Sequence, residues 1–169
     1  MNKLFPYALS ATILLSGLSI ASSAPAEAVT TSSQSVNQTI PYYTYNGYFR
    51  NNSKTLINKQ FVLALKNDNV KINGYMINKK RPKTEVKTQI KYRYDIMMDV
   101  YKNKVVGIHL LADEKAITLK QFKAAHKGTK ILKVKDYHNG AYHIIYQTKN
   151  GGSYEATFDN GYLTLVTIH

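Results

Sequence analysis

The stretch AYHIIYQTKNGGSYEATFDNGYLTLVTIH, residues 141–169, alternates apolar and polar side chains and is interrupted twice by glycine-containing turns. Alternation with a period of two is typical of a β-strand that buries one face. KNGG and DNG are hairpin-type turns, because Asn and Gly tolerate positive φ. The stretch therefore predicts three antiparallel strands, over 141–148, 153–158 and 162–169.

The same pattern extends towards the N-terminus. KILKVKDY at 130–137 predicts a further strand, joined to the next one by the turn HNG. YRYDIMMDVY at 92–101 and KVVGIHLLA at 104–112 predict a hairpin that turns at Lys102-Asn103. Shorter extended segments are expected at 42–49 and 70–77.

Three segments change to helical spacing, with apolar residues at intervals of three and four. Helices are predicted over 55–67, 85–91 and 119–127, and Gly128 is expected to end the last one. The caps expected for these helices are Ser53 or Thr55, Thr84 and Thr118, in that order.

A short helix followed by antiparallel strands occurs twice, and the strands end in similar patterns at 94–110 and 154–169. We therefore predict an α+β fold in which residues 41–169 form a single compact domain. Within it we expect two small helix-plus-antiparallel-sheet units, a tandem repeat of about 41–113 and 114–169. The repeat leaves open whether the two units share one sheet.

Residues 1–28 have the pattern of a secretory signal peptide. Lys3 precedes an apolar run at 8–21, and the small residues of SSAPAEA follow it, so we expect cleavage after Ala28. The apolar run is too short and too rich in serine to span a bilayer core of about 30 Å. Residues 29–40 are polar and aperiodic, which is typical of a flexible tether. We expect a secreted protein that is either released or held at the cell surface by charge.

The composition of the chain is basic and lacks cysteine, with a formal net charge of +13 over 169 residues. A secreted chain without disulfides must be stabilised by packing alone. Such a basic protein attracts polyanions, which include extracellular DNA or RNA, teichoic acid, heparin-like glycans and acidic proteins. The net charge does not choose among these partners, and the sequence does not indicate an oligomeric state.

No arrangement of residues in the sequence points to catalysis. The five histidines do not form a His-x-x-x-His pair or another zinc motif, and the carboxylates are scattered. A hydrolase needs a positioned carboxylate pair or a metal cage, and a nucleophile motif such as G-x-S-x-G is also absent. The sequence therefore predicts no catalytic residues, no metal site, no cofactor and no enzymatic activity.

Basic residues, in contrast, are clustered in two regions. In the first, between 79 and 93, Lys83, Lys87 and Lys91 recur every four residues and would share one face of a helix. The second begins in the helix predicted over 119–127 and extends to Lys135. Either cluster could follow a phosphate backbone, or could be an ordinary solvated face. The lysines and arginines that we predict to bind nucleic acid or another polyanion are Lys79, Lys80, Arg81, Lys83, Lys87, Lys91, Arg93, Lys120, Lys123, Lys127 and Lys130.

The segment PYYTYNGYF at 41–49 contains five aromatic rings in nine positions. Some of these rings must pack inward, because a small domain without cysteine needs large side chains in its core. Others could stack on bases, so we add Tyr42, Tyr43 and Tyr45 to the predicted binding residues. The alternative is a protein-binding module, an inhibitor or a ligand of a host protein, whose site centres on these exposed tyrosines.

Two motifs in the N-terminal half resemble a known family. PYYTYNGY at 41–48 and ALKNDNVKING at 64–74, with the leader before them, look like the staphylococcal immunodominant antigen B family, and the resemblance is dense over 39–77. It implies a secreted or surface-associated, non-enzymatic protein that binds extracellular nucleic acid without strong sequence preference. It supplies no residue-level binding motif, so the predicted site residues rest on residue type and spacing. The two α-β units also resemble the tandem fold of beta-lactamase inhibitor protein.

Overall fold

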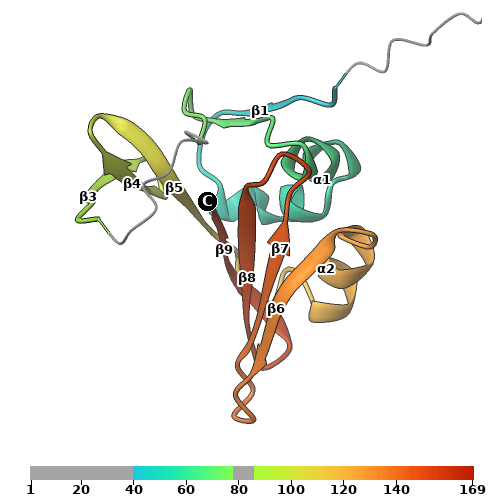
Figure 1. The fold of residues 1–169 in the computed structure, drawn as a ribbon. Helices are drawn as coiled ribbons and strands as arrows, with labels where there is room; N and C mark the ends of the chain where they lie inside the picture. Colours follow the sequence, from blue (N-terminus) through green and yellow to red (C-terminus); the bar gives the residue numbers. More distant parts are fainter. Residues whose placement is uncertain (1–39, 78–85) are drawn as a thin grey trace, which may run out of the picture. The chain divides into compact units, whose positions relative to one another are not determined.

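The structure is a computed structural model that describes residues 40–77 and 86–169. Figure 1 shows helices packed against a large antiparallel sheet, together with a separate sheet of two strands. The predicted α+β class is therefore confirmed. No helix within the described ranges is long and apolar enough to cross a membrane.

The helices are η1 (Arg50–Ile57), which has 3-10 geometry, α1 (Lys59–Lys66) and α2 (Leu119–Ala125). The single helix predicted over 55–67 is wrong, because Asn58 is extended and separates η1 from α1. The Asn58 side-chain oxygen accepts hydrogen bonds from two backbone N–H groups of α1, at 2.9 and 3.3 Å. The cap of α1 is therefore Asn58, and not Ser53 or Thr55.

The N-terminus of α2 is the one that the sequence predicts. The Thr118 hydroxyl accepts a hydrogen bond from the Gln121 N–H at 3.2 Å, and the Gln121 side-chain oxygen accepts one from the Thr118 N–H at 2.9 Å. This reciprocal pair is a capping box, which satisfies two N–H groups that a helix start would otherwise leave free. The chain leaves the helix before Gly128, whose φ of +80° favours glycine.

The large sheet consists of seven antiparallel strands, which are β3 (Gln89–Arg93), β4 (Ile96–Tyr101), β5 (Lys104–Leu111), β6 (Lys130–Asp136), β7 (Tyr142–Gln147), β8 (Ser153–Asp159) and β9 (Tyr162–Ile168). Their order across the sheet is β3-β4-β5-β9-β8-β7-β6. The runs β3-β4-β5 and β6-β7-β8-β9 each consist of consecutive hairpins, and they meet where β5 pairs with β9. The two halves of the chain thus share one continuous sheet. Strands β6 to β9 confirm the four strands predicted after residue 130.

The single strand predicted over 92–101 is wrong, because this stretch contains the end of β3 and the whole of β4. β3 and β4 are separated by a turn at Tyr94 and Asp95, and Tyr94 has φ of +57°. The Asp95 carboxylate accepts hydrogen bonds from the backbone N–H groups of Phe49 and Arg50, at 2.7 Å each. These bonds hold the turn at the start of η1, a contact between segments that lie far apart in the sequence.

The helix predicted over 85–91 is also wrong. Residues 86–88 form no regular element, and β3 begins at Gln89. Side chains four residues apart share a face in a strand as well as in a helix, so the lysine spacing could not separate the two. Ile90 and Tyr92 favour a strand, and β4 supplies the hydrogen-bonded partner. The predicted cap Thr84 lies outside the described residues.

The small sheet consists of β1 (Tyr43–Tyr45) and β2 (Val70–Ile72), which pair in parallel with Tyr43 opposite Val70. β2 is shorter than the strand predicted over 70–77, because the chain turns at Asn73 and Gly74. These two residues have φ of +49° and +89°.

The three helices pack on one face of the seven-stranded sheet, and Figure 1 shows α1 and α2 on the same side of β6 to β9. Leu56 of η1, Phe61 of α1 and Phe122 of α2 are fully buried in one apolar cluster with Tyr146 of β7. The ring centres of Phe122 and Tyr146 are 6.2 Å apart. We call the opposite side of the sheet the open face. On β7 its residues are His143, Ile145 and Gln147.

Candidate polyanion interface

The edge strand β6 carries three lysines on one exposed face. It pairs with β7 alone, and all seven of its residues are exposed. Lys130, Lys133 and Lys135 lie directly opposite the open-face residues of β7. Because paired residues of antiparallel strands point to the same side, these lysines project from the open face. We call the three lysines the basic edge.

A β-bulge gives the three lysines their common face. In KILKVKD, strict alternation would place Lys130 on one side of the sheet and Lys133 and Lys135 on the other. The register shifts between Ile131 and Lys133, so Leu132 is an extra residue with no partner of its own on β7. After the shift, Lys133 and Lys135 return to the side of Lys130.

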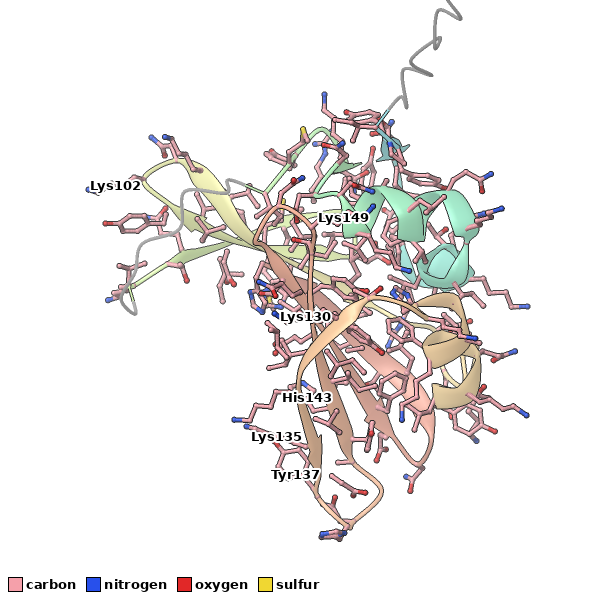
Figure 2. The ribbon with its side chains drawn as sticks, turned by 45° about the vertical axis from the view of Figure 1, so that its right-hand side comes forward. Lys102, Lys130, Lys135, Tyr137, His143 and Lys149 are labelled. Atoms are coloured by element: carbon pink, nitrogen blue, oxygen red, sulfur yellow. The ribbon has the colours of Figure 1, made fainter. Side chains whose placement is uncertain are left out.

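Two rings lie beside the basic edge, and Figure 2 shows Lys130, Lys135, Tyr137 and His143 along this side of the sheet. Tyr137 follows β6 and is 51% exposed. His143 lies directly opposite Lys135, and such pairs have Cβ atoms about 4.5–5.5 Å apart. Positive charge beside rings is the combination that proteins use to bind single-stranded nucleic acid.

The charge of the basic edge is not neutralised by carboxylates of the described residues. Within 40–77 and 86–169, the lysine that takes part in an ion pair is Lys115, 3.6 Å from Glu114. Several carboxylates are instead engaged by histidine. The Asp99 carboxylate is 2.9 Å from His109 Nε2, and Glu155 lies 3.5 Å from His169. The lysine ammonium groups of β6 are therefore available to an external anion.

A second explanation for lysines on β6 is protection of the sheet edge. An edge strand exposes unpaired backbone groups that can pair with another molecule, and lysines and bulges both prevent this. Ile131, Leu132 and Val134 are about half exposed, so an unprotected β6 would be prone to aggregate. The edge-protection and polyanion-binding roles predict different results when the lysines are replaced.

The predicted lysines of α2 lie apart from the basic edge. Lys120 and Lys123 of α2 are exposed, but α2 packs on the face opposite to the open face; Lys127 is exposed two residues beyond the end of the helix. The ammonium of Lys123 sits 4.6 Å from the centre of the Tyr142 ring and donates a hydrogen bond to its hydroxyl at 3.1 Å. The structure therefore divides the second predicted cluster, and joins Lys130 to Lys133 and Lys135 instead.

The first predicted cluster is described only in part, because Lys79, Lys80, Arg81 and Lys83 lie outside the described residues. Lys87, Lys91 and Arg93 are exposed, but Lys87 and Lys91 do not belong to a helix, so the predicted helical ridge does not form there. In β3, Lys91 lies opposite Met98 and Arg93 opposite Ile96, both of them buried residues on the helix-covered side. β3 is at the other edge of the sheet from β6, six strand spacings or roughly 29 Å away.

The tyrosines predicted to stack are for the most part packed against the core. The Tyr43 ring meets Phe61 edge-on at 5.4 Å, and the Tyr45 ring meets Phe49 at 4.9 Å. Tyr42 is 54% exposed and is thus the member of the predicted set that a ligand could reach most easily.

Another aromatic pair was missed by the sequence analysis. The rings of Tyr48 and Tyr94 are 5.0 Å apart and are 61% and 48% exposed. The guanidinium of Arg93 lies 5.2 Å from the centre of the Tyr94 ring. No local signal predicts this pair, because the turn at Asp95 brings the two tyrosines together. We call Tyr48, Arg93 and Tyr94 the aromatic platform.

The histidine network on the open face does not form a usable catalytic site. His109 is bonded through Nε2 to Asp99 and through Nδ1 to the Thr167 hydroxyl, at 2.9 and 3.2 Å. The order carboxylate, imidazole, hydroxyl is that of a catalytic triad. Thr167 is only 2% exposed, however, so its hydroxyl is closed to a substrate. In the described part of the chain, no three His, Asp or Glu residues are placed to hold a metal ion.

His126 is buried in the core, and its two ring nitrogens are both satisfied. Nε2 donates a hydrogen bond to the Leu56 carbonyl at 2.9 Å, and Nδ1 accepts one from the Tyr154 hydroxyl at 2.7 Å. The ring stacks on Phe122 with centres 3.9 Å apart. Burial lowers the pKa of His126 to about 4, so this residue is neutral and structural.

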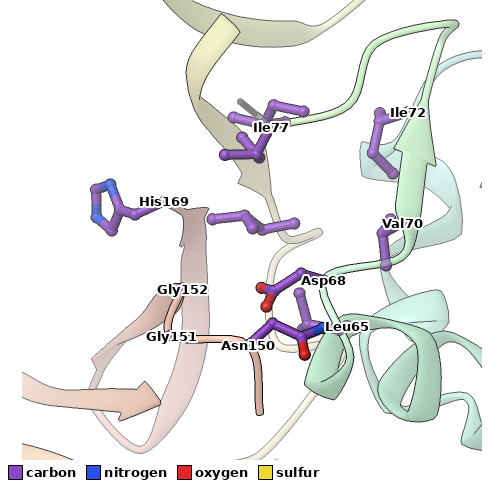
Figure 3. A pocket seen from close by; sticks show the side chains of 11 residues that line it. Leu65, Asp68, Val70, Ile72, Ile77, Asn150, Gly151, Gly152 and His169 are labelled. Atoms are coloured by element: carbon purple, nitrogen blue, oxygen red, sulfur yellow. The ribbon is translucent and has the colours of Figure 1, made fainter. Parts of the chain in front are cut away.

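A pocket of about 200 Å³ lies among the α1–β2 region, Ile108 of β5, the turn between β7 and β8 and the end of β9. Figure 3 shows Val70 and Ile72 on one side of it, while the ring of His169 points away on the other. The Asp68 carboxylate accepts a hydrogen bond from the Thr148 hydroxyl at 2.8 Å and lies against Gly152. This pocket carries little positive charge and does not contribute to a polyanion interface.

Comparisons with known proteins give the family. The model of the family described as immunodominant staphylococcal antigen B matches residues 42–168. Immunodominant staphylococcal antigen B proteins from Staphylococcus aureus strains USA300, NCTC 8325 / PS 47 and COL are each 40% identical to the chain over 79 residues. Each alignment covers 47% of this chain and 45% of the relative, so the chain spans less than half the length of these curated relatives.

No solved structure matches the chain significantly, so the similarity to the tandem fold of beta-lactamase inhibitor protein stays a prediction. The family match, in contrast, includes every helix and strand of the described residues, from β1 to β9. The chain therefore belongs to the immunodominant staphylococcal antigen B family.

Proposed function

We propose that this protein is secreted and non-enzymatic, and that it binds polyanions, extracellular nucleic acid above all, through the basic edge. The observation that supports this most directly is the common exposed face of Lys130, Lys133 and Lys135. Among the described residues no carboxylate pairs with these lysines, and Tyr137 and His143 lie beside them. The same charge would hold the protein at an anionic cell surface.

The proposed mechanism is neutralisation of phosphates along a strand of nucleic acid. Residues two apart in a β-strand are about 6.7 Å apart, which resembles the spacing of successive phosphates in an extended nucleic-acid strand. Each lysine that replaces condensed counterions adds to the affinity and to its dependence on salt. Phosphates are the same in every nucleotide, so these contacts carry no sequence information. We therefore expect weak sequence preference.

The test compares two triple variants with the same change in net charge. K130Q/K133Q/K135Q removes the basic edge, and K120Q/K123Q/K127Q removes the two lysines of α2 and the one just after the helix. Fluorescence anisotropy with a labelled single strand and a labelled duplex is measured over a salt series, and circular dichroism checks that both variants fold. For the single strand, each phosphate contact contributes about 0.7 to the slope of log affinity against log salt concentration. We therefore expect the β6 variant, which loses three lysines, to lower the size of this slope by about 2. The α2 variant should retain most of the slope.

Equal losses in the two variants would mean that only net charge matters, and would contradict a site on β6. Binding by the original protein that is independent of salt would contradict polyanion binding itself. If K130Q/K133Q/K135Q binds normally but aggregates, the lysines protect the edge and do not bind the ligand.

A second candidate function is protein binding through the aromatic platform. The observation that favours it is the exposed contact between Tyr48 and Tyr94, with the Arg93 guanidinium over the Tyr94 ring. Tyrosine and arginine are the residues that most often dominate protein–protein binding energy. Such a site would act as an inhibitor or as a ligand for a host protein.

The double variant Y48A/Y94A separates the two candidates. If the platform is a protein-binding site, the variant should lose on the order of tenfold or more in affinity for the protein partner, because each hot-spot residue is typically worth such a factor. Its salt slope with nucleic acid should stay unchanged, which anisotropy would show. A fall in nucleic-acid affinity without a change in slope would instead assign the platform to base stacking.

A further inference from the structure

A cavity of about 270 Å³ opens where β6 begins, next to the turn between β7 and β8. Three of its lining residues are lysines, each from a different segment: Lys66 of α1, Lys130 of β6 and Lys149 of the turn. The remaining lining residues are uncharged, and they are Gly128, Thr129, Gln147 and Thr148. Three lysines from three segments thus line one cavity whose lining contains no carboxylate.

Hydrogen bonds to backbone carbonyls hold Lys66 and the Lys149 backbone in place. The Lys149 N–H donates to the Lys66 carbonyl at 2.8 Å, and the Lys66 ammonium donates to the Lys127 carbonyl at 3.0 Å. An ammonium has three N–H donors, so two donors of Lys66 remain for a ligand. Burial lowers the pKa of Lys66, and the charge of Lys149 lowers it further. A bound anion would relieve this repulsion.

One lining residue, Thr148, is hydrogen-bonded to a carboxylate outside the cavity. Asp68 accepts a hydrogen bond from the Thr148 hydroxyl and lines the pocket of Figure 3 instead. Thr148 therefore has no proton to offer a ligand, whereas the lysines and the Gln147 amide of the lining are donors. This donor set suits an anion with several oxygens.

We propose that the cavity of Lys66, Lys130 and Lys149 binds a phosphoryl group. Lys130 belongs both to the cavity and to the basic edge, so a nucleic-acid strand along Lys133 and Lys135 would reach the cavity with its end. A terminal phosphate carries more charge than an internal phosphodiester and exposes three oxygens. Naming a nucleic-acid end as the source rests on the proposed function. Free phosphate has the same chemistry and provides an independent probe.

The experiment compares one single-stranded oligonucleotide with a 5′ phosphate and with a 5′ hydroxyl, both labelled at the 3′ end. We expect the protein to bind the phosphorylated form on the order of tenfold more tightly, the effect of one additional charge-assisted hydrogen bond. The variant K66Q/K149Q should lose this preference while keeping the basic edge. The matched control K54Q/K59Q, which changes two exposed lysines of η1 and α1, should retain the preference.

Equal affinity of the protein for the two oligonucleotides would overturn the cavity site and leave the proposed function intact. A preference that survives in K66Q/K149Q would also overturn it, because the phosphate would then bind elsewhere. If neither oligonucleotide binds, the proposed function fails. Titration with inorganic phosphate then tests whether the cavity binds a phosphoryl group. Saturable NMR shifts of the Gly128, Thr129 and Lys149 amides, absent in sodium chloride of equal ionic strength, would support the site. Their absence would overturn it.

Discussion

At the scale of single residues, His126 shows how position decides the role of a titratable group. An imidazole in water takes up a proton near pH 6.5. His126 is only 1% exposed, and its hydrogen bonds to the Leu56 carbonyl and the Tyr154 hydroxyl define the neutral form. Protonation would place a charge in the core and would remove the acceptor that the Tyr154 hydroxyl uses. The residue therefore makes the fold sensitive to acid without forming a site.

We predict that His126 destabilises the protein as the pH falls from about 6.5 to 4. The pKa is lower in the folded state, at about 4, so the unfolded state binds more protons in this window. The stabilisation is complete above the unfolded pKa and falls by about 3 kcal/mol as the pH approaches the folded one. Urea unfolding of the original protein and of His126→Gln at several pH values measures the effect. Glutamine retains a donor and an acceptor but does not titrate, so equal pH dependence in the two proteins would contradict the prediction.

At the scale of elements, the bulge in β6 explains how three lysines share one face although their spacing in the sequence does not alternate regularly. Leu132 is the additional residue, and the ladder continues on both sides of it. A bulge also twists an edge strand and makes it a poorer template for a neighbouring molecule. The bulge therefore serves the alignment of the lysines and the protection of the edge together.

Deletion of Leu132 separates these two effects. The remaining strand, KIKVKD, alternates regularly and keeps all three lysines on the open face, so we expect nucleic-acid affinity to change by less than about twofold. The flatter edge should increase self-association, which light scattering and size-exclusion chromatography measure. A large loss of affinity in a folded deletion variant would show that the bulge itself shapes the binding site.

At the scale of the whole molecule, acidic and basic groups have different surroundings. Asp68, Asp95 and Asp99 accept hydrogen bonds that join segments or neighbouring strands. Within the described ranges most lysines are exposed, and Lys115 is the one that pairs with a carboxylate. The positive charge of the described residues is thus largely presented outward. The comparison of β6 and α2 variants belongs to this scale, because it asks whether arrangement matters beyond net charge.

The features that the sequence determined by itself are those with local signals. Strands β6 to β9 follow from apolar alternation and turns such as Asn160-Gly161, and the start of α2 follows from Thr118. Each of these signals acts over a few residues, through side-chain alternation, positive φ or a capping hydrogen bond. The motifs in 39–77 likewise indicated the family that the comparisons show.

Only the tertiary structure decided the features that depend on contacts between distant segments. β3 became a strand because β4 pairs with it, and the Asp95 carboxylate brought Tyr48 to Tyr94. The cavity lysines come from α1, β6 and a turn, and no spacing in the sequence predicts their meeting. The register of β6 on β7 likewise placed Lys130 on the same face as the other lysines of the strand. Pairing and packing decide these positions, because local preferences differ by too little energy to choose between them.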